Sequence, residues 1–264
     1  MLGLGIAPRL RQFGREARRR LAHLARPRLV PGGRGERVDV IFSEPHDMPM
    51  GDRIVLYGLV RGLKPATYLE IGVRWGGSAR IVANAMEANG FGQAVGLDPD
   101  LSNFRPGAGA LFGRYATVEG YSPEDTPKAA ARLDGPIDLA FIDAVHTYSA
   151  VKSDLAGVAP LMAPGGHVLF HDAFHQGINE AVDEFLRANP DFVDLGMVSR
   201  NASVELPVSY FGLRLIRKGP LDFAAELGRA HARDGTPMPA LSAEVWDHDP
   251  YAERMGNPLG RPDA

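Results

Sequence analysis

"YLEIGVRWGGSARIVANAM", Tyr68 to Met86, is the stretch that decides the fold of this protein. It begins as a short apolar strand that contains Glu70, continues as a loop with glycines at 72, 76 and 77, and becomes a helix from Ser78. A strand that enters a helix through a glycine loop is typical of sheets that bind ligands at the carboxyl ends of their strands. Glycine lets the backbone of such a loop approach the ligand closely.

Strands and helices alternate along the chain around this stretch. We expect strands at 67–71, 93–98, 115–120, 137–143 and 167–172, and helices at 53–63, 78–88, 122–133, 146–162 and 177–188. Two further apolar segments, 191–198 and 209–218, are joined by a loop that is poor in helix formers, so we expect a hairpin. This order predicts an α/β fold with a Rossmann-like, doubly wound, mostly parallel seven-stranded sheet that has an antiparallel C-terminal hairpin strand.

The composition limits the class of protein and its chemistry. A hydrophobic content of 45% in 264 residues is that of an ordinary globular protein. The absence of cysteine excludes disulfides and thiolate metal sites, so a metal could only use His, Asp, Glu or other oxygen ligands. No apolar run approaches the roughly 18 residues of a transmembrane segment, and the N-terminus lacks a secretory signal. We therefore expect a cytoplasmic protein without a transmembrane segment.

The charge is distributed unevenly along the chain. Residues 1–37 carry ten arginines against two glutamates, so the remainder is acidic. We expect a basic leader at 1–37, a main domain at 38–218 and a C-terminal tail at 219–264. The leader could bind an anionic membrane or nucleic acid, or it could be a solvated arm that docks a partner. The acidic main domain is not expected to bind nucleic acid, and both termini could contribute to a homo-oligomer.

The spacing of the glycines favours one cofactor class over another. A dinucleotide fingerprint reads G-x-G-x-x-G, whereas this loop reads E-I-G-x-x-x-G-G-S. A carboxylate just before the loop would repel a pyrophosphate but could hold the ammonium and sulfonium of S-adenosylmethionine, directly or through the loop. Asp98, at the end of "VGLD", could accept hydrogen bonds from ribose hydroxyls. An NAD-dependent oxidoreductase using the same sheet edge remains the alternative.

These motifs resemble those of the class I S-adenosylmethionine-dependent methyltransferases over roughly residues 53–218. The resemblance implies a cofactor site at the first glycine loop, the ribose acid and the end of the third strand. Mapped onto this sequence, the cofactor-binding residues are Glu70, Gly72, Gly76, Ser78, Asp98, Gly120, Tyr121, Ser122 and Asp143.

Acids and histidines follow two neighbouring strands of the predicted sheet. Asp143 and His146 follow the fourth strand, and His171, Asp172 and His175 follow the fifth. Because adjacent strands lie about 4.8 Å apart, these side chains can meet over one edge. Two carboxylates and an imidazole could hold magnesium or manganese, while a transition metal would tolerate the imidazole better. A hydroxyl is a poor nucleophile until a metal or base removes its proton, and His146 can serve as that base.

The run I-D-x-x-H-x-Y, a helix, P-G-G and H-D is similar to the metal-dependent group that includes macrocin and mycinamicin sugar O-methyltransferases and the cephalosporin hydroxylase-like proteins. The resemblance implies a divalent metal, with magnesium first, at Asp143, His171 and Asp172, and a catalytic pair of His146 and Asp143. Two positions depart from the group, because His171 replaces an acid and Val145 replaces the acid that some relatives use as a base.

The expected function is therefore O-methylation of a small-molecule or sugar hydroxyl, in bacterial secondary metabolism or glycan modification. We expect residues 42–53 and 199–209 to select the acceptor. A non-catalytic cofactor-binding or scaffold protein is the other alternative.

Overall fold

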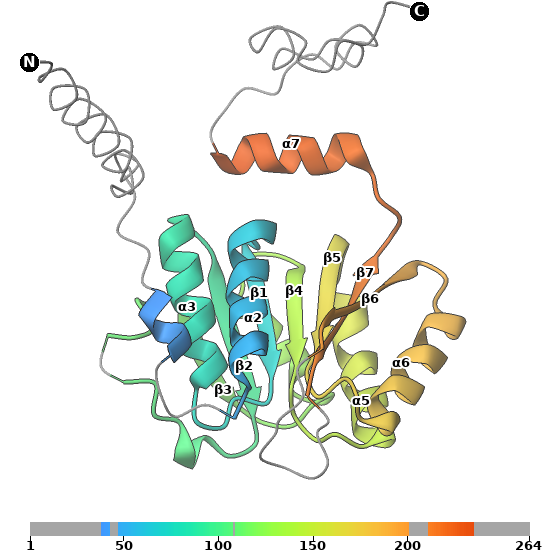
Figure 1. The fold of residues 1–264 in the computed structure, drawn as a ribbon, viewed down its shortest axis with the longest axis horizontal. Helices are drawn as coiled ribbons and strands as arrows, with labels where there is room; N and C mark the ends of the chain where they lie inside the picture. The colour runs from blue at the N-terminus through green and yellow to red at the C-terminus, as the bar shows by residue number, and fades with distance from the viewer. Residues whose placement is uncertain (1–37, 43–46, 108, 201–210, 235–264) are drawn as a thin grey trace, which may run out of the picture. The chain divides into compact units, whose positions relative to one another are not determined.

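A seven-stranded sheet forms the centre of the structure, a computed structural model that describes residues 38–42, 47–107, 109–200 and 211–234 (Figure 1). The strand order is β3-β2-β1-β4-β5-β7-β6. The strands are β1 Thr67–Ile71, β2 Gln93–Asp98, β3 Tyr115–Glu119, β4 Ile137–Ile142, β5 Met162–Phe170, β6 Phe192–Ser199 and β7 Leu213–Lys218. Strand β7 runs antiparallel to β5 and β6, whereas the pairs from β3 to β5 are parallel. The predicted Rossmann-like, mostly parallel sheet with an antiparallel C-terminal strand is confirmed.

Helices cover both faces of the sheet. Helices α2 (Met50–Leu63) and α3 (Gly77–Asn89) pack side by side on one face, where Figure 1 shows them in front of the strands. Helices α4 (Thr126–Ala130), α5 (Tyr148–Val158) and α6 (Gln176–Ala188) cover the other face. Short 3₁₀ turns complete the set: η1 Val38–Phe42, η2 Leu101–Asn103 and η3 Ala159–Leu161.

The two helical layers explain why the central strands are short apolar runs. In β1, Leu69 and Ile71 face the layer of α4, α5 and α6, while Tyr68 faces α2 and α3. Every residue of β1 is buried, as expected for a parallel strand covered on both faces. Each fully buried aliphatic or aromatic side chain of this kind contributes about 1.5–3 kcal/mol.

The strand order creates a switch point between β1 and β4. The chain moves outward from β1 to β2 and β3, then returns to place β4 on the other side of β1. Ligands of doubly wound sheets bind where the order reverses, at the carboxyl ends of the strands. Backbone hydrogen bonds continue past these ends, from Gly72 N to Leu97 O (2.9 Å) and from Asp143 N to Ile71 O (2.9 Å). The loops after β1 and β4 are therefore held against each other.

Some predicted boundaries are wrong. Helix α4 begins at Thr126 instead of Ser122, because Pro123 precedes it and Pro127 fits its first turn, and it ends at Ala130 instead of Leu133. Helix α5 begins at Tyr148, capped by Thr147, whose side chain accepts a hydrogen bond from Ala150 N. His146 therefore lies in the loop before the helix. Strand β5 begins earlier than expected and ends at Phe170, so His171 and Asp172 lie just beyond it.

A second compact unit begins at Gly219 and contains a helix that the sequence analysis did not predict, α7 (Phe223–Asp234). The side chain of Asp222 accepts a hydrogen bond from Ala225 N at its start, an N-cap arrangement. The basic leader, most of the predicted acceptor loop at 199–209 and the end of the tail lie outside the described residues. No helix within the described ranges is long and apolar enough to cross a membrane.

Candidate active site

The glycine loop after β1 rests directly on the loop after β4. Gly72 has a φ of 89°, a left-handed conformation that favours glycine. A Cβ at Gly72 would lie 2.2 Å from the carbonyl oxygen of Asp143, so no side chain fits there without displacing one loop. Gly76, with a φ of 79°, approaches the ring of Phe104 in the same way, since a Cβ there would lie 2.7 Å from Cε2. These glycines thus hold the loop against its neighbours.

Glu70 lies beneath the glycine loop and supports it from inside. Its carboxyl group is buried and accepts hydrogen bonds from Ser78 Oγ, at the start of α3, and from Tyr115 Oη, at the start of β3. Burial raises the pKa of Glu70 to about 8, although the bonds from Ser78 and Tyr115 act in the opposite direction. At neutral pH the group is therefore mostly protonated. Its effect on a ligand acts through the loop and α3.

Asp98 ties the glycine loop to the end of β2. Its Oδ2 accepts hydrogen bonds from the backbone N–H groups of Val73 (2.7 Å) and Arg74 (3.0 Å). Its Oδ1 accepts one from the N–H of Asp100 (2.8 Å). The carboxylate therefore fixes the loop backbone and, through its remaining lone pairs, can accept bonds from ligand hydroxyls.

Two adjoining cavities follow the carboxyl edge of the sheet. The larger measures about 530 Å³ and the smaller about 340 Å³, and both are lined by Gly72, Pro99, Ala144 and Val145. Of the predicted residues, the larger is lined by Gly72, Ser78, Asp98, Asp143, His146, His171 and Asp172, and the smaller by Gly72, Gly120, Tyr121 and Ser122. Glu70 and Gly76 line neither cavity. A single cleft thus runs from the end of β3 to the end of β5.

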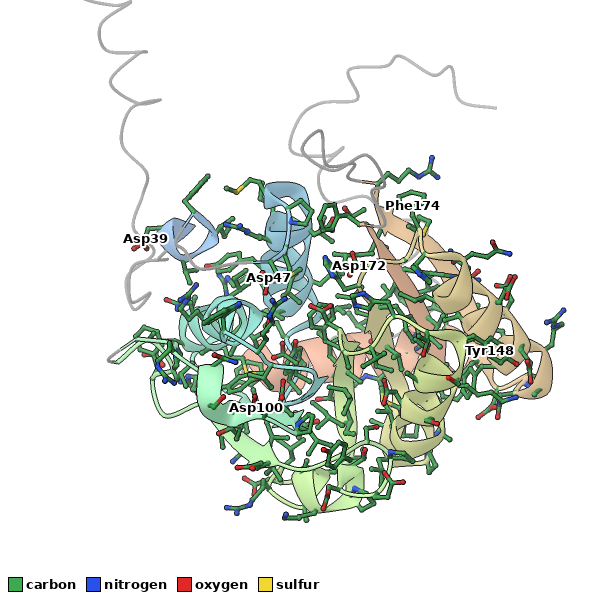
Figure 2. The ribbon with its side chains drawn as sticks, turned by 90° about the horizontal axis from the view of Figure 1, so that it is seen from below. Asp39, Asp47, Asp100, Tyr148, Asp172 and Phe174 are labelled. Atoms are coloured by element: carbon green, nitrogen blue, oxygen red, sulfur yellow. The ribbon has the colours of Figure 1, made fainter. Side chains whose placement is uncertain are left out.

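Asp143, His146, His171 and Asp172 meet at one end of this cleft. His146 places Nε2 3.4 Å from Asp143 Oδ1 and Nδ1 3.1 Å from Asp172 Oδ2. His171 Nδ1 lies 3.1 Å from Asp143 Oδ1 and 3.3 Å from Asp172 Oδ2. Figure 2, which looks onto this edge, shows Asp172 between Asp47 on one side and Phe174 on the other. The predicted cluster is therefore brought together, whereas His175 caps α6 by accepting from Gly177 N.

His171 is held from behind by a buried acid of α2. Its Nε2 lies 3.3 Å from Asp52 Oδ2, and Asp52 also accepts hydrogen bonds from Ser199 Oγ and from Gly212 N (3.0 Å). Burial would lower the pKa of His171, but the charge of Asp143 and the bonds to the surrounding carboxylates hold it well above its usual range. A buried imidazole flanked by three carboxylates is thus stabilised as a cation.

The electrostatics of the other members follow from the same contacts. Burial would raise the pKa of Asp143, but His171 and His146 outweigh it and hold that pKa well below its usual range. The bond to Asp143 raises the pKa of His146; Asp172 adds to this rise and burial opposes it. Asp143 is therefore an ionised acceptor, and His146 is a stronger base than a free histidine.

The donor set fits a divalent cation. Asp143, His146 and Asp172 each offer a ligand atom, and these atoms all lie within 4.8 Å of one another. Adjacent ligands about 2.1 Å from an octahedral cation lie about 3 Å apart, which is close to the separations found here. Two carboxylates and an imidazole, with water completing the shell, suit manganese or another transition metal as well as magnesium. In this geometry the imidazole of the set is His146, whereas the resemblance implied His171.

Three residues of the site were not singled out from the sequence. Tyr115 donates a hydrogen bond to Glu70, Asp52 forms an ion pair with His171, and Asp154 of α5 lines the smaller cavity. All three are buried polar side chains within elements, and no spacing relates them to the motifs. Only the burial of a polar residue in an otherwise apolar stretch could have pointed to them.

Comparison with known proteins agrees with this geometry. Residues 69–173 match the model of a family described as "Methyltransferase domain". An O-methyltransferase from Bacillus cereus in complex with S-adenosylhomocysteine has a similar fold, with a TM-score of 0.54, 19% identity, and coverage of 66% of this chain and 84% of that one. The O-methyltransferase TomG from Streptomyces achromogenes, involved in tomaymycin synthesis and solved with S-adenosylmethionine, gives a TM-score of 0.54, 18% identity, and coverage of 66% and 82%.

A search of curated protein sequences finds no significant match. The segment that matches the family begins in β1 and ends just after His171 and Asp172, so it contains both the glycine loop and the acid–histidine cluster. This match favours a methyltransferase over the dinucleotide-dependent alternative. Residues 69–173 therefore match a methyltransferase domain, and the fold around them is similar to that of the two solved O-methyltransferases.

Proposed function

We propose that this protein is an S-adenosylmethionine-dependent O-methyltransferase that acts on a hydroxyl of a small molecule or sugar. One observation carries the proposal: the contact between Gly72 and Asp143 joins the cofactor loop to a cluster of acids and imidazoles within one cleft. A sulfonium donor bound along the loop would place its methyl group near groups able to deprotonate a hydroxyl. The two solved relatives are described as O-methyltransferases, which is consistent with this chemistry.

In the proposed reaction, the acceptor oxygen attacks the methyl carbon in line with the carbon–sulfur bond. The electrons of that bond move to sulfur, which leaves S-adenosylhomocysteine, and the hydroxyl proton moves to His146. His146 suits this role because its side chain is 36% exposed, lines the larger cavity and is oriented by Asp143 and Asp172. Orientation of the two reactants in the cleft would supply much of the rate.

A divalent cation would be held by the carboxylates of Asp143 and Asp172, with an imidazole nitrogen as a further ligand. When bound, such a cation supplies electrostatic stabilisation of the developing alkoxide. The chain itself contributes the orientation of the carboxylates, because His171 lies within ion-pair distance of both and of Asp52 behind it. Residues that contact the ligands from behind in this way maintain the geometry of the ligands in metal sites.

The walls near the cluster favour a ring-shaped acceptor. Met48, Trp75 and Phe211 line the larger cavity, and Arg74 pairs with Asp47 at 3.2 Å beside them. An aromatic face can stack on an apolar sugar face or on an aromatic ring, while the charged pair can bond to hydroxyls. We propose a glycan or a glycosylated small molecule as the first acceptor class to test.

The first experiment measures cofactor binding and metal-dependent turnover separately. Isothermal titration should detect binding of S-adenosylmethionine, and a mass gain of one methyl group should identify acceptors in a sugar panel assayed with and without magnesium or manganese. Asp143→Asn should abolish turnover while changing cofactor affinity by less than about 10-fold. Asp191→Asn, an exposed acid before β6, is the matched control and should match the wild type. Absence of binding at high micromolar cofactor in folded protein would overturn the proposal.

A second variant tests the role of His146. If His146 is the general base and the cation is held by Asp143 and Asp172 with His171, as the family resemblance implies, the variant His146→Ala should lose about 10²- to 10⁴-fold in turnover and keep the affinity of the protein for manganese. Loss of manganese affinity in this variant would instead assign His146 to the metal, as its distances to Asp143 and Asp172 also allow.

A further inference from the structure

Helix α2 presents an outer face without a charged side chain. The structure describes this helix in full, and its exposed residues lie one turn apart in a single row, Met50, Ile54, Gly58 and Gly62. Met50 is 39% exposed and Ile54 50% exposed. A surface helix of a globular protein ordinarily carries charged or polar residues on the side opposite the core. The outer side of α2 is therefore suited to contact something other than bulk water.

A large apolar side chain of η1 extends this side of the molecule. Val40 and Ile41 of η1 are buried in the core under α2 and α3, whereas Phe42 is 63% exposed. Arg53 fixes η1 to the start of α2, because its Nη1 donates to Ile41 O (3.3 Å) and its Nε donates to Met48 O (2.6 Å). The residue after Ile41 is thus held close to the first turns of α2.

The three exposed side chains of Phe42, Met50 and Ile54 form what we call the apolar face, and this face borders the cleft. Met48, whose carbonyl group is held by Arg53, lines the larger cavity, and Met50 follows two residues later. Grouped exposed apolar side chains of this kind mark contact surfaces more often than isolated ones do. Whatever covers the apolar face therefore lies beside the larger cavity.

The basic leader, residues 1–37, leads directly into η1. It lies outside the described residues, but its sequence has two properties of a membrane-surface segment. It carries ten arginines against two glutamates. Its apolar residues also recur at the spacing of one side of an amphipathic helix, at Leu10, Phe13, Ala17, Leu21 and Leu24. A basic segment with this pattern is typical of binding to anionic lipid surfaces.

An anionic bilayer is the occupant that uses both the leader and the apolar face. Nucleic acid would pair with the arginines but leave the apolar face uncovered, and the acidic remainder of the chain would oppose its approach. A symmetric pairing of two copies through the apolar face would bring together two leaders of like charge, because each leader begins next to that face. A bilayer offers anionic head groups and an apolar layer at the same surface, and stable attachment to it takes two signals of this kind.

We propose that the basic leader and the apolar face form one docking surface for an anionic lipid bilayer. The arginines contact the lipid phosphates, and the side chains of Phe42, Met50 and Ile54 enter the boundary between the head groups and the acyl chains. The protein rests on the bilayer surface, and the larger cavity is held beside that surface.

Cosedimentation of the full chain with lipid vesicles measures this docking. The wild type should bind vesicles of equal parts phosphatidylglycerol and phosphatidylcholine at least about 100-fold more strongly than vesicles of phosphatidylcholine alone. The binding should weaken as the salt concentration rises, because salt screens the attraction between the arginines and the head groups.

A charge variant tests the contribution of the leader. Replacement of Arg18, Arg19 and Arg20 by glutamine should weaken binding to the anionic vesicles about 100-fold, since each basic residue near such a surface contributes roughly 5-fold. The matched control removes three exposed cations that lie near the helices on the other side of the sheet, and it should stay within about 3-fold of the wild type. Its substitutions are Lys128→Gln, Arg132→Gln and Arg187→Gln.

An apolar variant tests the contribution of α2. Ile54→Ser should weaken binding to the anionic vesicles about 10-fold, because the serine leaves less apolar surface to insert, whereas Ile54→Leu should bind as the wild type does. Both variants should keep the circular dichroism spectrum of the wild type and its affinity for S-adenosylhomocysteine, since Ile54 is half exposed and does not line either cavity.

Each contrary outcome assigns the surface differently. A wild type that does not bind anionic vesicles, or that binds both kinds of vesicle equally, overturns the inference without any variant. Ile54→Ser that binds as tightly as the wild type overturns the role of the apolar face. A dimer in sedimentation velocity that Ile54→Ser dissociates, without vesicle binding, would assign the face to a second copy, and tighter binding to duplex DNA than to vesicles would assign the leader to nucleic acid. The titration with S-adenosylhomocysteine is independent of these results, so the proposed methyltransferase is tested separately.

Discussion

Replacement of Glu70 by glutamine tests whether the acid under the glycine loop is protonated in the native protein. Ser78 and Tyr115 bond to different oxygens of Glu70, so the amide keeps an acceptor oxygen for one of these hydroxyls, can donate its NH2 group to the other, and cannot ionise. The carboxyl group of Glu70 has a pKa of about 8 in the native state, against an ordinary value of 4.5 that applies to the unfolded chain. Between these values the native state binds more protons than the unfolded state, so the stabilising contribution is complete below pH 4.5 and is lost as the pH rises towards 8.

The size of this effect follows from the same two values. A proton bound only in the native state changes the free energy of unfolding by about 1.4 kcal/mol per pH unit, which amounts to roughly 4–5 kcal/mol across the window. Glu70 is fully buried, so solvent screening does not reduce the figure appreciably. Other groups, including Asp154, titrate in both proteins and cancel in the difference between wild type and variant.

Urea unfolding of the wild type and Glu70→Gln at pH 5, 6, 7 and 8, followed by circular dichroism, measures this difference. The variant should gain stability relative to the wild type by about 1 kcal/mol per pH unit above pH 5. A difference that stays constant within about 0.3 kcal/mol over this range would refute the reasoning. It would mean that Glu70 is ionised in the native protein and that its charge is available to a cationic cofactor.

Three further substitutions test the cleft. Gly72→Ala should lower the free energy of unfolding by about 1–3 kcal/mol and weaken cofactor binding more than about 10-fold, because the new methyl group would overlap the carbonyl group of Asp143. A variant with the melting temperature and cofactor affinity of the wild type would contradict this contact. Asp98→Asn should weaken S-adenosylhomocysteine binding by about 10- to 100-fold in titrations, since the amide accepts fewer bonds from the loop and the ribose. Asp52→Asn should lower the free energy of unfolding by about 3–5 kcal/mol, because it leaves the buried His171 without one of its carboxylate partners. A loss of less than about 1 kcal/mol in chemical denaturation would argue against that pairing.

The sheet could be predicted from the sequence because its signals are local. Strands β1, β2 and β4 are buried apolar runs bounded by glycine, proline or aspartate, and their predicted limits lie within about a residue of the observed ones. The predicted start of helix α4 was too early because Pro123 and Pro127 place the first turn at Thr126. Helix α7 has an N-cap and a polar face, but the sequence after Gly219 shows no strong helical periodicity of apolar residues, so this helix was not predicted.

The residues of the site likewise divide into those with a local sequence signal and those without one. Gly72, Asp98 and Asp143 follow strand ends, where topology alone brings them to one edge, so their grouping could be predicted. The contacts of Asp52 and Asp154 could not, because each depends on how a helix packs against residues far away in the chain. The roles of the two histidines likewise depend on side-chain orientation, which strand order does not determine.

The contact between Gly72 and the carbonyl group of Asp143 has a consequence for how donor and acceptor affect each other's binding. Neither loop can shift without moving the other, so a ligand that reorganises one of them performs work on both. Occupancy of the donor half of the cleft and occupancy of the acceptor half should then be thermodynamically linked, and each should change the dissociation constant of the other by the same factor, whichever arrives first.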